Sequence, residues 1–209
     1  HPLLLLANRD EFHARPTVAL AQWADLPIIH AGRDLQAGGT WVGIAQNGRF
    51  AALTNIRQPQ KLALRSRGDL VQQYLSNNDE PECYLRGVLQ QRDAFNGFNL
   101  LVGDRQQLCF FNSKQNQAQC LAAGVYGLSN ASLDTPWRKL VQARSRFSQH
   151  LNSTDEELFQ LMRDEGRPAD NQLPDTGVGL ATERFLSSMF IRGEHYGTRS
   201  TSILRFSGH

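Results

Sequence analysis

Long hydrophobic runs, an excess of charge of one sign and closely spaced cysteines are all missing from this chain of 209 residues. No apolar run approaches the roughly 18 residues of a membrane-spanning helix, so we expect no membrane span. A basic and apolar signal sequence is missing too. The formal net charge is +2 and aromatic residues are scattered, which gives no support to a nucleic-acid-binding face. These absences are typical of a cytoplasmic globular protein.

Cysteines are few, and histidines at metal-binding spacing are absent. Cys83, Cys109 and Cys120 are an odd number, and none of them occurs in a CxxC motif. This pattern argues against a disulfide framework and for a reducing compartment. Cys83 falls in an expected helical stripe and the other two in expected strands, so the three are interpreted as small core residues or as bystanders without a role. The six histidines never occur in HxH or HxxxH spacing, and we expect no preorganised zinc site and no cofactor.

The signatures of several enzyme classes are missing as well. The chain has no GxSxG nucleophile elbow, no GxxxxGK[ST] phosphate loop and no GxGxxG turn, which excludes the common serine-hydrolase and nucleotide-binding motifs. Four polar segments and two later cations remain as candidates for a site: residues 8–11, 32–34, 54–55 and 129–130, with Arg184 and Arg199.

Two hairpins are the clearest structural signals. The Asn-Gly step at residues 47–48 separates two β-rich runs, 40–45 and 49–54, and such a step is the strongest short-range hairpin signal. The same pattern predicts a second hairpin from 98–102 and 107–111, with a third strand near 118–121.

Helical periodicity lies between and after these strands. It predicts helices over 69–75 and 82–91 and a short one over 182–190. Another helix is expected to begin at Pro136, with one face formed by Trp137, Leu140, Val141, Phe147 and Leu151. A capping box at 153–156 is expected to open a helix over 157–163. Residues 166–179 read as a loop, and 198–206 as a last strand. Because hairpins and helices follow in blocks without strict βαβ order, the sequence predicts one α+β domain over residues 1–209 with antiparallel sheet.

The most informative junction follows the apolar run 2–6, which is expected to be a buried strand. Asn8, Arg9, Asp10 and Glu11 come directly after it. Charged side chains at the end of a core strand cost free energy unless they are paired or used. The segment is therefore either a salt-bridged turn or the wall of a site.

Residues 7–12, Ala-Asn-Arg-Asp-Glu-Phe, are identified as the motif that names the NRDE family, the transport and Golgi organisation protein 2 family. Further strings resemble the same family in the expected order: 31–35 with 38–41, 50–55, 127–130 and 196–200. Together these matches extend over nearly the whole chain.

The resemblance implies that the family is a branch of the N-terminal nucleophile hydrolases. It also implies their fold, a four-layer αββα sandwich of two antiparallel sheets. In the cysteine members, an N-terminal Cys is the nucleophile and its own α-amino group, with a pKa near 7.7–8.0, is the base. By similarity to bile salt hydrolases and penicillin V acylases, Asp10 would orient that amine, and Asn55 and Asn130 would stabilise the oxyanion. Arg184 resembles the late arginine that supports the nucleophile electrostatically.

Each of these residues also has a structural interpretation. Asp10 is either this site residue or a cap, or a partner of Arg9 or Arg33. Asn55 and Asn130 are either oxyanion donors or turn residues that satisfy local backbone groups.

The candidate ligand-binding residues are Asn8, Arg9, Arg33, Trp41 and Arg199. Arg199 is expected in a structural ion pair or an anion-binding contact. Trp41 either packs in the core or forms the floor of a pocket.

The resemblance places the nucleophile at the front of the family's chains, whereas this sequence begins at His1 and its first cysteine is Cys83. We therefore expect that a short N-terminal segment with its strand, and the C-terminal end, are missing from the sequence. Two functions remain open: an N-terminal-cysteine hydrolase or acyltransferase acting on an amide or other acyl bond of a small molecule, and a non-catalytic carrier of an amphipathic ligand such as haem or acyl-CoA. A homodimer is compatible with either, and fold alone does not choose between them.

Overall fold

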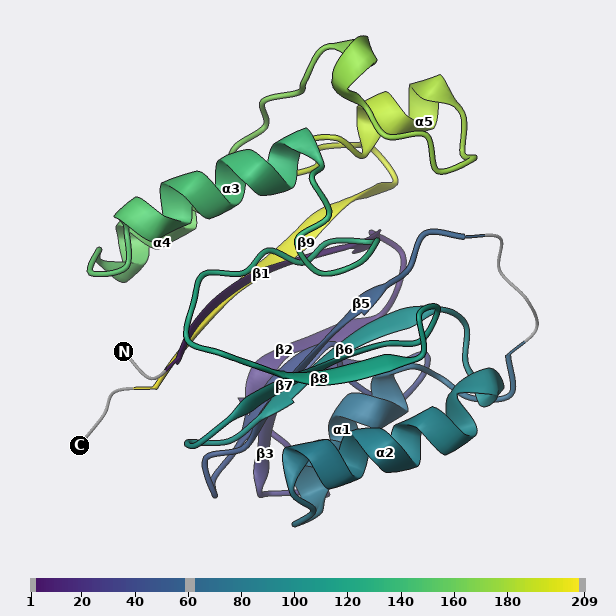
Figure 1. Cartoon of the computed structure of the whole chain (residues 1–209), viewed down its shortest axis with the longest axis vertical. Coiled ribbons are helices and arrows are strands. Elements are labelled where there is room, and N and C mark those ends of the chain that lie inside the picture. The colour runs from purple at the N-terminus through teal and green to yellow at the C-terminus, as the bar shows by residue number, and fades with distance from the viewer. Residues whose placement is uncertain (1–2, 59–62, 207–209) are drawn as a thin grey trace. The chain divides into compact units, whose positions relative to one another are not determined.

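The computed structural model describes residues 3–58 and 63–206, so Pro2 of the expected first strand lies outside the described residues. The described part contains two antiparallel sheets and five α-helices, which confirms the mixed α+β class (Figure 1). The chain divides into two compact units. The first comprises the segment up to Ala14 with 125–128 and 133–209, and the second comprises 15–124 and 129–132.

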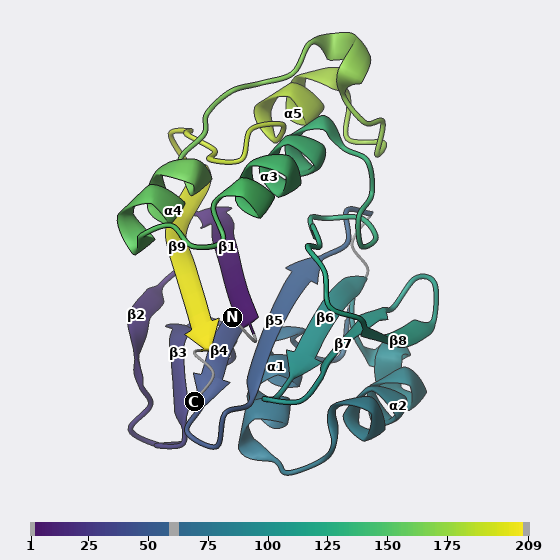
Figure 2. The ribbon, with the colours of Figure 1, turned by 60° about the vertical axis from the view of Figure 1, so that its left-hand side comes forward.

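The second unit is built on a seven-stranded sheet in which sequence neighbours pair antiparallel in order from edge to edge (Figure 2). Its strands are β2 (Thr17–Gln22), β3 (Ile29–Asp34), β4 (Val42–Ala45), β5 (Phe50–Asn55), β6 (Phe98–Gly103), β7 (Leu108–Asn112) and β8 (Gln117–Leu121). Both predicted hairpins are confirmed. Gly48 has φ of 85° in the β4–β5 turn, a conformation that glycine adopts without steric cost.

Two helices of this unit, α1 (Gly68–Ser76) and α2 (Pro81–Gln91), pack on the sheet, and the short 3₁₀ helix η1 (Arg92–Ala94) follows α2. The predicted stripes are confirmed: Leu70, Val71, Tyr74 and Leu75 of α1 are fully buried. The same core also includes Tyr84, Leu85 and Val88 from α2, Phe98, Leu100 and Val102 from β6, and Phe111 from β7. The alternation along β6 turns every second side chain toward the helices.

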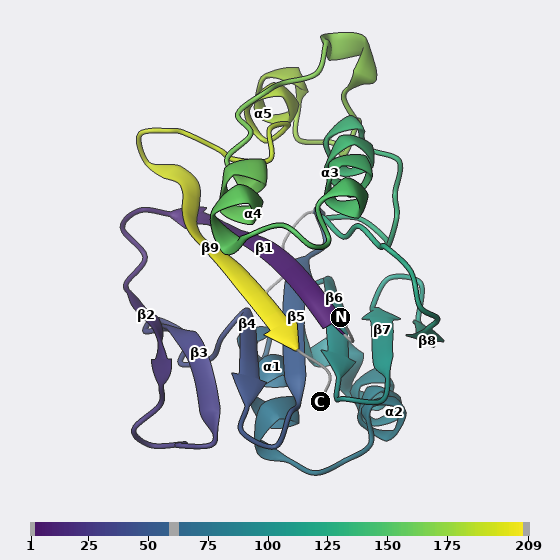
Figure 3. The same cartoon turned by 90° about the vertical axis from the view of Figure 1, so that its left-hand side faces the viewer.

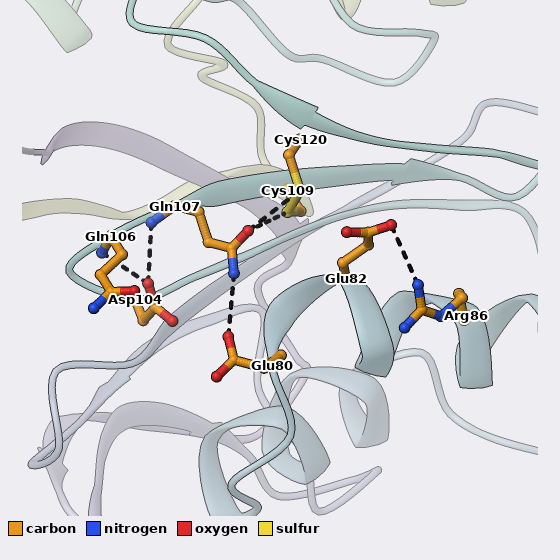
Figure 4. The surroundings of a disulfide bond; sticks show 8 residues. All are labelled: Glu80, Glu82, Arg86, Asp104, Gln106, Gln107, Cys109 and Cys120. Carbon is orange, nitrogen blue, oxygen red and sulfur yellow. Dashed lines mark hydrogen bonds and ion pairs between the residues drawn. A yellow bond between two sulfur atoms is a disulfide. The ribbon is translucent and has the colours of Figure 1, made fainter.

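The interpretation of Cys109 and Cys120 as unbonded core residues is wrong, because the two form a disulfide bond. They lie directly opposite each other on β7 and β8, with Cα atoms 3.9 Å apart. Cys109 is buried and Cys120 is exposed on the edge strand. Gln107 lies beside the bond and donates to Glu80 Oε2 at 3.2 Å (Figure 4).

Cys83 also differs from its predicted place in the core. It lies on the outer side of α2, where it is an exposed free thiol. Arg86 Nη2 is 2.9 Å from its sulfur. The helical stripe of α2 therefore passes beside Cys83 rather than through it.

Reducing the Cys109–Cys120 bond is expected to lower the free energy of unfolding by about 2–3 kcal/mol, because the bond closes a short loop and constrains the unfolded chain. The measurement is thermal unfolding with and without dithiothreitol in a Cys83→Ser background, with the thiols counted by mass spectrometry. Cys83→Ser alone should leave the transition unchanged. A transition that is the same in the oxidised and reduced proteins would contradict the prediction. The same thiol count on protein taken from cells would test the predicted reducing compartment.

The first unit holds a two-stranded antiparallel sheet of β1 (Leu3–Phe12) and β9 (Tyr196–Phe206). Its helices are α3 (Arg138–Gln149), α4 (Asp155–Met162) and α5 (Leu180–Phe185), with the 3₁₀ helix η2 (Asp170–Gln172) in the expected loop (Figure 3). Helix α4 contacts both strands and α3, and its Leu158 is fully buried.

The helices of this unit depart from the sequence prediction in three places. Helix α3 begins at Arg138 rather than Pro136, none of its residues is buried, and Val141 of the expected apolar face is 48% exposed. The capping box is shifted by one residue: Thr154 caps α4 and Glu157 completes the box. The last helix ends at Phe185, five residues before the predicted end. The periodic pattern located the helices but not their ends.

Candidate functional site

The polar segment after the first apolar run is part of strand β1 itself, which corrects its placement beyond the strand. β1 pairs with β9 as far as Phe12, and Leu3–Leu6 are half-buried whereas Arg9 is only 8% exposed. The register shifts between Arg9 and Asp10, which pair with Ser200 and Thr198. Arg199 is thus the extra residue of a β-bulge. A bulge of this kind redirects the neighbouring side chains and is common beside functional sites.

Asp10 is the half-buried carboxylate at this bulge. Its Oδ1 accepts a hydrogen bond from Thr198 Oγ1 at 2.5 Å. Burial raises the pKa of Asp10, while the Thr198 hydrogen bond and the charge of Lys139 act in the opposite direction. Among the described residues, Asp10 Oδ2 has no hydrogen-bond partner. The carboxylate therefore has one fixed oxygen and one oxygen open to a further donor.

None of the structural alternatives for Asp10 is found in the described part of the chain. Asp10 lies within a strand and caps no helix. Arg9 lies 3.8 Å from Glu11 Oε2, and Arg33 forms its ion pair with Asp25.

The raised pKa of Asp10 predicts a specific pH dependence of stability. Because the folded protein binds this proton more tightly than the unfolded chain does, the contribution of Asp10 is fully present below its ordinary pKa of 3.8 and is lost as pH rises through the raised value. Asp10→Asn should therefore gain stability relative to wild type as pH increases from about 3.5 to 7. Urea unfolding of both proteins across this range tests the sign. A difference between them that does not change with pH would contradict it.

The side chain of Asn8 forms its hydrogen bonds with residues of its own unit. Its Nδ2 donates to the carbonyl oxygens of Met162 and Met189, both at 2.9 Å, and its Oδ1 accepts from Thr201 Oγ1 at 2.7 Å. These bonds join β1 to α4, to β9 and to the segment after α5. The geometry favours a structural role over ligand binding.

The two arginines expected late in the chain lie at the surface of the first unit. Arg184 on α5 forms a bidentate ion pair with Asp170 at 2.9 and 2.6 Å, which raises the pKa of Arg184 and lowers that of Asp170. Arg199 is exposed, and its Nη1 donates to the carbonyl of Phe12 at 3.3 Å. Of the two, only Arg199 adjoins the bulge at Asp10.

Asn55 and Asn130 meet in the second unit. Asn130 Nδ2 donates to the Asn55 carbonyl at 2.9 Å, and Arg57 N–H donates to the Asn130 carbonyl at 2.8 Å. Asn55 is exposed at the end of β5, and its side-chain amide has no hydrogen bond to any described residue. The arrangement leaves the Asn55 amide available as a donor, with Asn130 holding the backbone beside it.

A buried asparagine that the sequence reasoning missed holds this segment in place. Asn99 on β6 is fully buried; its Nδ2 donates to the carbonyl of Ala131 at 2.5 Å and to Thr54 Oγ1 at 3.1 Å. Its Oδ1 accepts from Asn112 at 2.8 Å. An asparagine in the middle of the apolar run 98–102 was the available signal, because such a buried amide requires partners.

Arg33 and Trp41 have packing roles in the second unit. Arg33 donates to both carboxylate oxygens of Asp25 at 2.6 and 2.8 Å and stacks 4.2 Å above the ring of Trp23. Trp41 is half-buried, and its ring lies so close to Gly32 that an added Cβ there would be 2.6 Å from Cη2. These contacts fit the core-packing interpretation of Trp41.

Neither a metal-binding cluster nor a membrane-spanning helix occurs in the part of the chain that the structure describes. No group of three or more His, Cys, Asp or Glu side chains in residues 3–58 and 63–206 could hold a metal ion. Within the same ranges, no helix has the length and apolar character needed to cross a membrane.

Comparison with known proteins gives consistent matches over the whole chain. The family described as "Transport and Golgi organisation 2" matches residues 1–209. The "Transport and Golgi organization protein 2 homolog" of Homo sapiens is 34% identical over 97% of this chain and 81% of its own length. The homologue of Bos taurus is 32% identical over the same shares. The "Transport and Golgi organization protein 2" of Drosophila melanogaster is 26% identical over 98% of this chain and 81% of its own length.

Proposed function

The chain belongs to the transport and Golgi organisation 2 family, and on that premise we propose that it is an N-terminal-cysteine hydrolase or acyltransferase acting on an amide or other acyl bond of a small molecule. The observation that supports this most strongly is Asp10: a half-buried carboxylate at a bulge, with one oxygen fixed by Thr198 and the other without a partner among the described residues. A buried carboxylate with an open oxygen is suited to hold a cationic amine.

The proposed reaction uses the N-terminal cysteine that the resemblance to N-terminal nucleophile hydrolases implies. Its α-amine, whose ordinary pKa is about 7.7–8.0, takes the proton of the thiol, and the sulfur attacks the acyl carbon. The C–N bond then breaks, the leaving amine takes the proton, and a thioester remains. Water completes hydrolysis, whereas another nucleophile completes acyl transfer. Asp10 would keep the α-amine oriented through both steps.

Each remaining site residue enters the proposal on the geometry of its own unit. The side-chain amide of Asn55 is exposed and has no hydrogen bond to a described residue, whereas the Asn130 amide donates to the Asn55 carbonyl. Asn55 therefore fits the role of an oxyanion donor better than Asn130 does. Arg184 would support the nucleophile electrostatically. Its ion pair with Asp170 already neutralises much of its positive charge, which weakens this support.

We also propose the four-layer αββα sandwich of the N-terminal nucleophile hydrolases as the fold. The support is that each unit has one antiparallel sheet with helices packed against it. The second unit contributes seven strands with α1 and α2, and the first contributes β1 and β9 with α4.

The test of the function uses the full-length natural protein and iodoacetamide. N-terminal sequencing identifies the mature first residue, and peptide mass mapping locates the alkylated thiols. Because Cys83 is an exposed free thiol, the experiment is done in a Cys83→Ser background. We expect one equivalent of label on an N-terminal cysteine. A blocked or absent N-terminal cysteine, or one that resists alkylation, would leave the carrier of an amphipathic ligand such as haem or acyl-CoA as the better account.

A further inference from the structure

Thr198 has a set of hydrogen bonds that exceeds what the pairing of two strands requires. Its N–H donates to the carbonyl of Ile191 at 2.8 Å, and its hydroxyl oxygen accepts from the N–H of Ile191 at 2.9 Å. The same hydroxyl donates to Asp10 Oδ1 at 2.5 Å. The backbone of Ile191 therefore binds both the backbone N–H and the hydroxyl of Thr198. Ile191 itself is buried.

This arrangement fixes the direction of the hydroxyl proton. A threonine hydroxyl has a single proton and two acceptor lone pairs. Since the Ile191 N–H is a donor only, the Thr198 oxygen must accept from it, and its own proton is directed to Asp10. A fixed donor favours the ionised carboxylate over the neutral acid. The β-bulge places Thr198, rather than Arg199, opposite Asp10.

We propose that Thr198 is the positioning residue of Asp10: it holds Oδ1, keeps the carboxylate ionised against its burial, and thereby presents Oδ2 to the amine. The presentation of Oδ2 to an amine rests on the proposed function, whereas the control of Asp10 ionisation by Thr198 does not. No sequence pattern assigned a separate role to this threonine, which lies in the matched string 196–200.

Lys139 is the charged side chain from a helix that acts on Asp10. It lies on α3, its charge lowers the pKa of Asp10, and its Nζ donates to the Leu186 carbonyl at 2.9 Å. On β1, the neighbours Arg9 and Glu11 alternate to the opposite face from Asp10, and Arg199 on β9 donates to the Phe12 carbonyl. On α5, Arg184 pairs with Asp170. Lys139 must therefore stay unchanged in any variant used to measure Asp10.

The experiment measures the titration of Asp10 by carboxyl ¹³C NMR in the full-length protein, with Asp10→Asn used to assign the signal. Thr198→Val keeps the shape of the side chain but removes the donor, and Thr198→Ser restores it. We expect Thr198→Val to move the Asp10 titration upward by about one pH unit, and Thr198→Ser to stay within a few tenths of wild type. If Thr198→Val does not fold, Thr198→Ala gives the same comparison with a smaller side chain.

A second readout separates this proposal from the proposed function. The rate of iodoacetamide labelling at the N-terminal cysteine is followed against pH, and its acid limb should shift with the Asp10 titration in Thr198→Val. An Asp10 titration unchanged by loss of the hydroxyl would overturn the role of Thr198, whatever the labelling shows. A shifted titration without any N-terminal labelling would support the control of Asp10 by Thr198 and overturn the presentation of Oδ2 to a cysteine amine.

Discussion

Replacing Asp10 by asparagine is expected to reduce thioester formation at the N-terminal cysteine by at least about 100-fold, the lower range for losing a group that controls a proton transfer. The amide has nearly the shape of the carboxylate and can still accept from Thr198 Oγ1, so the fold should persist. What it lacks is the negative charge that holds a cationic amine. The measurement is single-turnover acylation by an activated acyl donor, followed by quenched intact-mass spectrometry.

The matched control is Asp155→Asn in the same unit. Asp155 lies at the start of α4, where its Oδ1 is 2.8 Å from Arg205 Nη2, and an exposed pair of this kind contributes at most about 1 kcal/mol. This variant should acylate at the wild-type rate. If Asp10→Asn and Asp155→Asn acylate equally fast, Asp10 does not orient the base.

The second large effect is expected on stability from Asn99→Leu. The leucine removes both donors and the acceptor of a fully buried amide, and it leaves Asn112 Nδ2 and the Ala131 carbonyl without their partner. Leaving buried polar groups unsatisfied costs about 1–3 kcal/mol each. We therefore expect the free energy of unfolding to fall by about 2–4 kcal/mol in urea titrations.

Asn99→Leu should also release the segment that holds Asn55. The amide of Arg57, which donates to the Asn130 carbonyl at 2.8 Å, should lose most of its protection from hydrogen exchange. The control is Asn152→Leu, at an exposed turn position, which should change neither quantity by more than about 0.5 kcal/mol. Retained protection at Arg57 together with wild-type stability would show that the buried amide does not support this segment.

The local part of the fold could be predicted because its causes are local. The Asn-Gly step at 47–48 fixes the turn between β4 and β5, and the spacing of Leu70, Val71, Tyr74 and Leu75 fixes the buried face of α1. The apolar pattern of α3 did not predict burial in the same way, since none of its residues is buried. Periodicity identifies a helix, whereas burial depends on what packs against it.

The site was only partly predictable because its partners are distant in sequence. Asn8 is satisfied by Met162, Met189 and Thr201, and no local pattern indicates these contacts. They explain why β1 continues through polar residues that the sequence suggested would end it. The sequence pattern singles out Asp10 as a candidate, but its position inside the strand and its bond to Thr198 follow from the pairing with β9.

The disulfide, too, could not be predicted from the sequence. The sequence placed Cys109 and Cys120 in adjacent strands, yet the odd cysteine count argued for unbonded thiols. Strand register decides the matter, because it puts the two residues opposite each other. A register shifted by one residue would have turned the two side chains to opposite faces of the sheet.

The most direct test of the account is intact-mass spectrometry of the full-length protein after incubation with a panel of acyl donors, acyl-CoA and N-acyl amides among them. We predict a covalent mass increase equal to the acyl group, located by peptide mapping on an N-terminal cysteine and decaying as product forms. In Asp10→Asn the same increase should appear at least about 100-fold more slowly. Donors that bind reversibly and are recovered unchanged, with no acyl group on the protein, would contradict the hydrolase and favour ligand carriage.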